Sequence, residues 1–112
     1  MSKPPIRAYS RYSVSAVQLI GQLIRIARKE SKQTTIEISE RAGVSRGLLQ
    51  RIEKGDPKCS IGAVFEVAKI VGVKLFDADE TTLTKHLLQT EDKLTLLPKS
   101  IRKKVRKVND DF

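Results

Sequence analysis

Apolar residues recur at helical spacing along most of the chain. In residues 17–30 one stripe is apolar while Gln18, Gln22, Arg25 and Arg28 fall on the other side, which predicts an amphipathic helix beginning near Ser13 or Ser15. The expected buried face is wide and comprises Val17, Leu19, Ile20, Leu23, Ile24, Ile26 and Ala27. Gly21 interrupts this helix at a cost of about 1 kcal/mol relative to alanine. We therefore expect another helix to cross closely at Gly21.

Two shorter helices are expected next, joined by a turn of three residues. Thr34 and Glu37 match a capping box, in which each residue bonds the backbone amide of the other, so the second helix begins here. Gly43 allows the positive φ that a tight helix exit requires. Ser45 is expected to cap the third helix and Gly55 to end it. Two helices joined by a short turn containing glycine have the layout of a helix-turn-helix.

The third expected helix has two different sides. Its apolar residues, Leu48, Leu49 and Ile52, are expected to pack on the core. The residues left on the outer side are Arg46, Gly47, Gln50, Arg51 and Lys54. Arginine can pair with guanine and glutamine with adenine in a major groove, and each pair contributes ~1–3 kcal/mol of discrimination. The alternative is an ordinary solvated helix face.

Two more helices are predicted toward the C-terminus. Ser60 is expected to cap a fourth helix that ends before Gly72, and the alternating residues 73–76 predict a short strand. The fifth helix is expected to start at Asp79 or Thr81 and to end near Leu97. Its leucines at positions 83, 87, 94 and 97 form either a dimer seam or a face that folds back on the chain.

Charge and composition narrow the class of partner. The 112 residues carry a net charge of +9, which favours an anionic partner: nucleic acid, a membrane surface or an acidic protein. One cysteine and one histidine, far apart, argue against a zinc site and against most hydrolytic constellations. We therefore expect no enzyme activity and no cofactor. A single cysteine, Cys59, also excludes an internal disulfide framework; beside Lys58 it is either an inert residue or a thiol of lowered pKa.

The stretch "TTIEISERAGVSRGLLQRIEKG", with "IGAVFEVAKIVG" after it, resembles the helix-turn-helix domain of the Xre and phage-repressor family. The resemblance implies an all-α fold of five short helices, operator DNA as ligand and a homodimer. It places base contacts on Arg46, Gly47, Gln50 and Arg51, and DNA backbone contacts on Thr34, Thr35, Ser45 and Lys54. The family commonly has glutamine where Thr35 stands, which weakens that contact. Glu53 matches an acidic position that in the family usually pairs internally, and Arg41 is a candidate partner.

A narrower resemblance covers more of the chain. "RYSVSAVQLIGQLIRIARK", "RIEKGDPKCSIGAVFEVAKIVGVKLFDAD" and the ending "VNDDF" are similar to HipB-like antitoxins, the small regulators paired with HipA-type kinase toxins. This resemblance implies a bacterial cytoplasmic protein that represses its own operon and contacts the kinase. Asp110, Asp111 and Phe112 are the candidate toxin contacts.

The expected organisation has four parts. These are a flexible basic arm (1–12), the helix-turn-helix domain (13–76), a C-terminal helix that is a candidate dimer contact (77–98), and a tail that is basic and then acidic (99–112). Two other functions stay open: a phage-type repressor without a toxin, and a toxin-neutralising module with secondary DNA binding. A role at a membrane surface is the weakest, because no helix combines a basic face with exposed aromatic residues and no apolar run approaches the ~20 residues of a membrane span.

Overall fold

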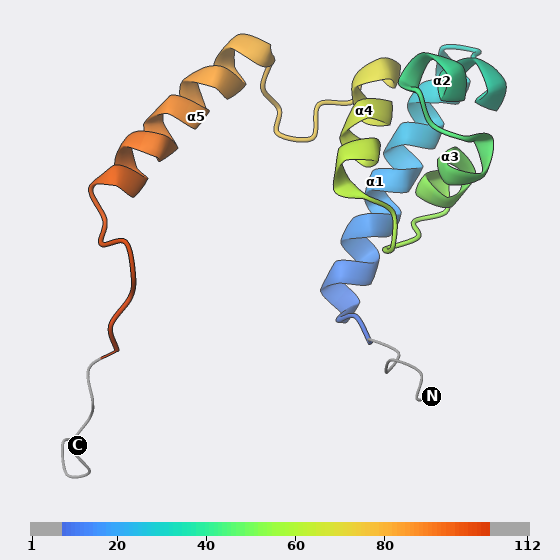
Figure 1. Cartoon of the computed structure of the whole chain (residues 1–112). Helices are drawn as coiled ribbons and strands as arrows, with labels where there is room; N and C mark the ends of the chain where they lie inside the picture. Colours follow the sequence, from blue (N-terminus) through green and yellow to red (C-terminus); the bar gives the residue numbers. More distant parts are fainter. Residues whose placement is uncertain (1–7, 104–112) are drawn as a thin grey trace. The chain divides into compact units, whose positions relative to one another are not determined.

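The computed structural model of the chain describes residues 8–103, and every regular element in that range is an α-helix, which confirms the all-α prediction. The helices are α1 (Arg11–Glu30), α2 (Thr35–Ala42), α3 (Arg46–Glu53), α4 (Ile61–Val71) and α5 (Glu80–Thr95) (Figure 1). The chain divides after Asp77 into two compact units. The first contains α1 to α4, and the second contains α5. Between residues 8 and 103, no helix has both the length and the apolar character needed to cross a bilayer.

The helix boundaries follow from local capping. Thr34 and Glu37 form the predicted capping box, with the Thr34 hydroxyl accepting from the Glu37 N–H at 3.1 Å and the Thr34 N–H donating to Glu37 Oε1 at 2.8 Å. Gly43 ends α2 with a φ of 70°, as predicted. The first helix begins earlier than expected, at Arg11, because the Ser10 hydroxyl accepts from the Ser13 N–H at 3.2 Å and so caps it. Ser60 occupies the N-cap position of α4, but its hydroxyl makes no capping hydrogen bond.

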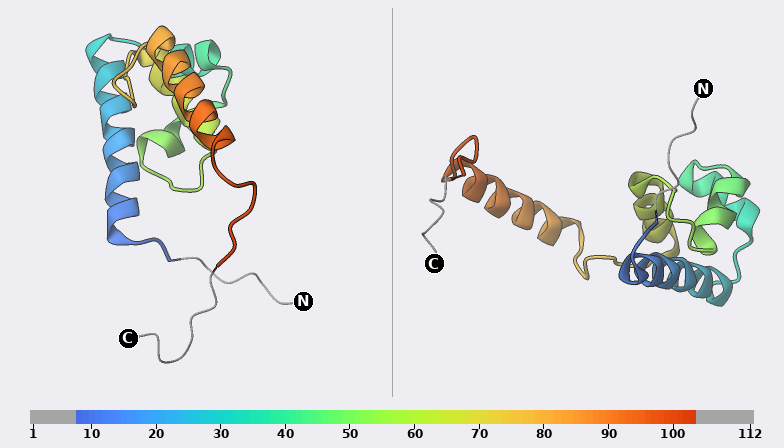
Figure 2. Two further views of the ribbon diagram at one scale, coloured as in Figure 1. Left: turned by 90° about the vertical axis from the view of Figure 1, so that its left-hand side faces the viewer. Right: turned by 90° about the horizontal axis from the view of Figure 1, so that it is seen from below.

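The four helices of the first unit surround one small aliphatic core. The main contacts join α1 to α3 and α4, and join α2 to the same two helices. Figure 2 shows α1 running along one side of this group. Each helix contributes one fully buried aliphatic side chain: Ile24, Ile38, Leu49 and Val67. Their shared burial is the main hydrophobic contribution to the stability of this unit.

The buried face of α1 is narrower than the sequence predicts. Only Gly21 and Ile24 are buried, while Leu19, Leu23 and Ile26 are exposed at 55%, 42% and 52%. Because α1 packs chiefly against two helices, its contact is a stripe, and the flanking apolar residues fall outside it.

Gly21 lies where α1 and α3 cross, as its position predicts. A β-carbon added at Gly21 would lie 2.5 Å from the carbonyl oxygen of Ile52 and 2.9 Å from that of Glu53. Real carbon and oxygen atoms do not approach so closely, and both neighbours are backbone atoms that cannot turn away. The absence of a side chain therefore allows the two helices to touch.

Residues 73–76 do not form the predicted strand. Gly72 ends α4 with a φ of 87°, and the Val73 N–H donates to the Ala68 carbonyl at 2.8 Å, which completes a helix C-cap. The Phe76 ring then stacks on Phe65, with centroids 5.7 Å apart. Within residues 8–103 no neighbouring strand exists to pair with this segment, so capping and ring packing determine its conformation.

The second unit is built on α5, whose start and length agree closely with the prediction. Asp79 caps it by accepting from the Thr82 N–H at 2.8 Å. The helix ends at Thr95, and the Leu96 and Leu97 N–H groups bond the carbonyls three residues back before Pro98. None of its residues is buried, and Leu83, Leu87 and Leu94 are all exposed. Both interpretations of the leucine register therefore stay open.

The contact at Gly21 generates a stability prediction. Gly21→Ala should lower the free energy of unfolding by about 1–3 kcal/mol, the usual cost of overpacking a core. The matched control is Gly62→Ala in α4, where an added β-carbon would meet nothing within 4 Å. That control should leave stability unchanged or raise it by up to about 1 kcal/mol. Urea unfolding followed by circular dichroism measures both, and equal stability of the two variants would contradict the close crossing.

Candidate nucleic-acid interface

The third helix, α3, presents one side to the core and the other to solvent. Leu49 and Ile52 are buried on the inner side. The outer side carries the residues that the sequence assigned to base and backbone contact, and all are exposed: Arg46, Gly47, Gln50, Arg51 and Lys54. Two cationic fork-shaped side chains and one amide therefore share this surface, which has the donor chemistry that base edges in a major groove accept.

The start of α3 is fixed by Ser45. Its hydroxyl accepts from the Leu48 N–H and its carbonyl from the Leu49 N–H, each at 3.0 Å. The amides of Arg46 and Gly47 lie in the first turn, where no carbonyl of the same helix can accept from them. They are available to an anionic group, because the N-terminal end of a helix favours negative charge.

Gly47 is not required by packing. A β-carbon added there would lie no nearer than 4.0 Å to the Ser45 Oγ, its closest neighbour. A larger residue would fit and would raise helix propensity by about 1 kcal/mol. What glycine provides is an uncovered stretch of backbone in the first turn of α3, where a ligand can approach closely.

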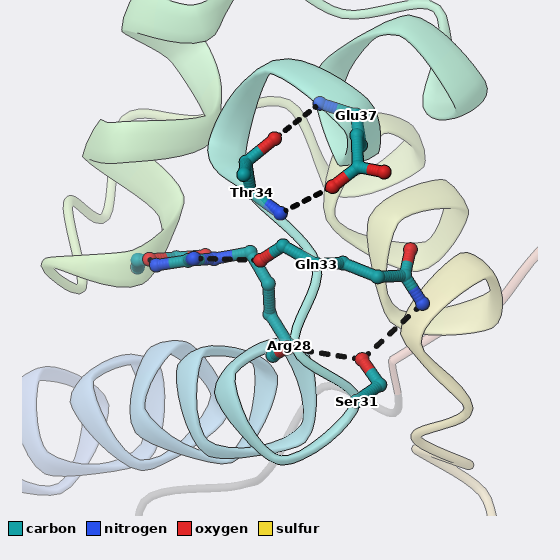
Figure 3. A network of polar contacts seen from close by, with 6 residues as sticks. Arg28, Ser31, Gln33, Thr34 and Glu37 are labelled. Carbon is teal, nitrogen blue, oxygen red and sulfur yellow. Dashed lines mark hydrogen bonds and ion pairs between the residues drawn. The ribbon is translucent and has the colours of Figure 1, made fainter.

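The end of α3 is held by a bidentate ion pair with α1. Arg28 Nε donates to Glu53 Oε2 at 2.6 Å, and Arg28 Nη2 donates to Oε1 at 2.9 Å. The side chains are only 12% and 7% exposed. The hydrogen bond that Arg28 donates to Glu53 raises the pKa of Arg28 above its ordinary value. Arg28 Nη1 also donates to the Gln33 carbonyl at 3.1 Å, which ties the residues before α2 to the same point (Figure 3).

Two sequence predictions about this pair were wrong. The sequence pattern places Arg28 on the side away from the core and offers Arg41 as a candidate partner of Glu53. Arg41 instead donates to the Gln33 side-chain oxygen at 2.8 Å. Gly21, Ile24 and Arg28 follow the spacing i, i+3, i+7, so they lie on one face of α1, which is the face that crosses α3. That spacing was the signal that could have identified Arg28.

Thr34 and Thr35, the candidates for DNA backbone contact at the start of α2, already form some contacts within the fold. The Thr34 hydroxyl and N–H both serve the capping box with Glu37 (Figure 3). Hydrogen bonds to the Glu37 carboxylate, first from the Thr34 backbone and then from its side chain, lower the Glu37 pKa. Thr35 is half-buried, and its first-turn amide has no acceptor within α2.

Arg51 has a partner that the sequence analysis missed. Its Nε donates to Asp56 Oδ2 at 2.8 Å, while Asp56 Oδ1 accepts from the Lys58 N–H at 2.8 Å. These bonds, first that of Lys58 and then that of Arg51, hold the Asp56 pKa below its ordinary value. No spacing rule of the sequence connects Asp56 to Arg51. The Arg51 side chain remains 51% exposed.

Other candidates are separate from this surface. Asp110, Asp111 and Phe112 lie outside the described residues. Burial raises the pKa of the Cys59 thiol, which argues against a reactive cysteine. In the described part of the chain, no three His, Cys, Asp or Glu side chains gather in a way that could hold a metal ion.

A second surface of the first unit is an open apolar groove. It has a volume of about 530 Å³ and runs between α1, α4 and residues 73–76. Its lining includes Leu19, Leu23, Ile61, Phe65 and Phe76, which are all exposed. It is distinct in composition from the polar outer side of α3, so the two surfaces suit different kinds of partner.

Comparison with known proteins adds no family to this description. No protein-family model matches the chain, and no curated protein matches it. The functional argument therefore depends on the geometry of α3 and on the motif resemblance described above.

The buried ion pair generates a second stability prediction. Arg28→Ala should cost about 3 kcal/mol, because it leaves the Glu53 carboxylate buried without a partner. Arg41→Ala is the matched control, since it removes an exposed arginine that donates a hydrogen bond to Gln33 and lies outside the core. It should change stability by no more than about 0.5 kcal/mol. Similar melting curves for the two variants would contradict the assignment of Arg28 as the internal partner.

Proposed function

We propose that this protein is a sequence-specific DNA-binding transcriptional repressor of the bacterial cytoplasm that acts as a homodimer. The observation that carries the proposal is the outer side of α3, where Arg46, Gln50 and Arg51 are exposed on a helix held at both ends. Such a helix is expected to enter the major groove with these side chains against base edges.

Phosphate contacts are proposed to flank the base contacts. Ser45 and Lys54 lie at the two ends of α3, and Thr34 and Thr35 lie at the start of α2. Hydroxyl groups and first-turn amides suit phosphate oxygens. Together with the net charge of +9, these contacts should make binding strongly dependent on salt, because each neutralised phosphate releases counterions.

The dimer is proposed from apolar surface that each of the two units, taken by itself, leaves uncovered. The groove beside α4 and the leucines of α5 are both exposed. Contiguous apolar surface of this kind marks sites where protein partners bind. A two-fold dimer would bind two half-sites separated by about one helical turn of DNA, ~34 Å.

The narrower proposal is an antitoxin that represses its own operon and binds a HipA-type kinase toxin. It is supported by the likeness to HipB-like antitoxins, which extends beyond the residues of the helix-turn-helix. A stand-alone repressor is the alternative, and a kinase gene next to the gene for this protein distinguishes the two.

Two substitutions on α3 separate base contact from phosphate contact. Arg51→Ala should reduce discrimination between the preferred and a scrambled duplex by about 1–3 kcal/mol, because a bidentate base contact is lost. Lys54→Ala should weaken binding to both duplexes alike and reduce the slope of log affinity against log salt by about 1. Fluorescence anisotropy titrations over a range of salt concentrations measure both effects.

The control for these titrations is Lys69→Ala, which removes an exposed lysine from α4. It should leave discrimination unchanged. Full discrimination by Arg51→Ala would refute the role of Arg51, and equal, weak binding of all duplexes by the unaltered protein at low salt would refute the proposed function.

Deletion of residues 108–112 tests the toxin contact. If the terminal acids and Phe112 bind the kinase, the shortened protein should fail to co-purify with the kinase encoded by the adjacent gene. Its affinity for the operator should not change, because the deleted segment carries none of the proposed DNA contacts. Unchanged co-purification would show that the kinase does not bind through residues 108–112.

A further inference from the structure

We propose that Asp56 is a positioning residue that orients Arg51 for base recognition. This inference depends on the proposed DNA-binding function and names a residue outside α3 that determines its specificity. The carboxylate accepts from Arg51 Nε at 2.8 Å, which is the inner nitrogen of the guanidinium. Within residues 8–103 the two outer nitrogens, Nη1 and Nη2, make no hydrogen bond, so the double donor needed for guanine O6 and N7 stays available.

Asp56 can orient Arg51 because its own position is fixed by three backbone features. Its N–H donates to the Arg51 carbonyl at 3.0 Å, and its Oδ1 accepts from the Lys58 N–H. Gly55 precedes it with a φ of 79°, a conformation that favours glycine. A β-carbon on Gly55 would lie 2.8 Å from the Gln18 α-carbon. The turn that carries the carboxylate is therefore pressed against α1 and does not move freely with the side chain of Arg51.

Holding Arg51 before binding should favour the specific complex. A free arginine has several rotatable bonds, and ordering them on binding reduces affinity. The Arg51 side chain is half-exposed, so the carboxylate restricts it without covering it. An arginine that already points in one direction loses less conformational freedom when it meets the correct base.

Removal of the Asp56 charge should have different effects on DNA binding if Asp56 positions Arg51 and if it only repels phosphate. Asp56 is negative and lies beside a surface proposed to bind DNA, so a carboxylate that only repels phosphate would weaken all binding. Its removal would then strengthen binding to every duplex by the same factor. If Asp56 positions Arg51, its removal must instead lower the preference for the correct sequence.

The test compares Asp56→Asn with the unaltered protein on two duplexes. One is the sequence enriched by the unaltered protein from a random library, and the other is a shuffled version of it. Asparagine keeps an oxygen for the Lys58 N–H but loses the charge that holds Arg51 Nε. The ratio of the two affinities should fall roughly 5- to 10-fold, within the range of one bidentate base contact, while affinity for the shuffled duplex stays equal or rises.

Three further variants control this result. Glu66→Gln removes an exposed carboxylate from α4 and should affect both duplexes alike. Asp56→Ser keeps an oxygen that can accept from the Lys58 N–H but has no carboxylate for Arg51 Nε. It should lose the same discrimination as Asp56→Asn, and it tests the inference if Asp56→Asn folds poorly. In an Arg51→Ala background, Asp56→Asn should cause no additional loss of discrimination.

The outcomes separate this inference from the function on which it depends. If the library yields no enriched sequence with the unaltered protein, both the proposed function and the role of Asp56 are wrong. If a sequence is enriched but Asp56→Asn keeps the full affinity ratio, DNA recognition stands and Asp56 does not position Arg51. Additive losses in the double variant would overturn the inference in the same way.

Discussion

The ion pair between Arg28 and Glu53 determines where α3 lies. It joins the last residue of α3 to the C-terminal part of α1, and its third bond reaches the Gln33 carbonyl just before α2. A buried pair of this kind adds little net stability compared with well-packed apolar residues. Its directional bonds nevertheless fix the relative position of three chain segments, and the contact at Gly21 brings the two helices close enough for these bonds to form.

The outer side of α3 is ordered because contacts within the fold hold the helix in place. The helix has eight residues, and an isolated helix of that length would be unstable in water. The Ser45 cap, the burial of Leu49 and the Glu53 pair hold its beginning, middle and end. A surface formed in advance loses less entropy when it binds. Leu49 and Glu53, which stabilise α3 from within, are different from the residues proposed to contact bases, so these two sets can be altered separately, whereas Ser45 serves both as a cap and as a proposed phosphate contact.

The sequence predicted features that depend on near neighbours better than those that depend on distant ones. The capping box at Thr34 and the positive φ of Gly43 involve residues within a few positions of each other, and both were correct. The predicted partner of Glu53 was wrong because Arg41 is closer to Glu53 in the sequence, whereas Arg28 is the arginine that contacts Glu53 in the folded chain. Residues 73–76 alternate between apolar and polar side chains as a strand does, but a strand also needs a neighbouring strand with which to pair. Asp56 was missed because its effect depends on the turn made by Gly55.

Arg28 and Arg51 show how burial separates structure from recognition. Both arginines bond a carboxylate through Nε. Arg28 is almost covered, and both of its outer nitrogens donate hydrogen bonds within the fold, one to Glu53 and one to the Gln33 carbonyl. Arg51 is half-exposed, and within residues 8–103 it forms a hydrogen bond through Nε alone. Since a guanidinium offers donors on two edges, a single internal bond restricts Arg51 while leaving one edge for a ligand. The number of donors left over, more than the charge itself, distinguishes Arg51 from Arg28 as an arginine that can still bind a ligand.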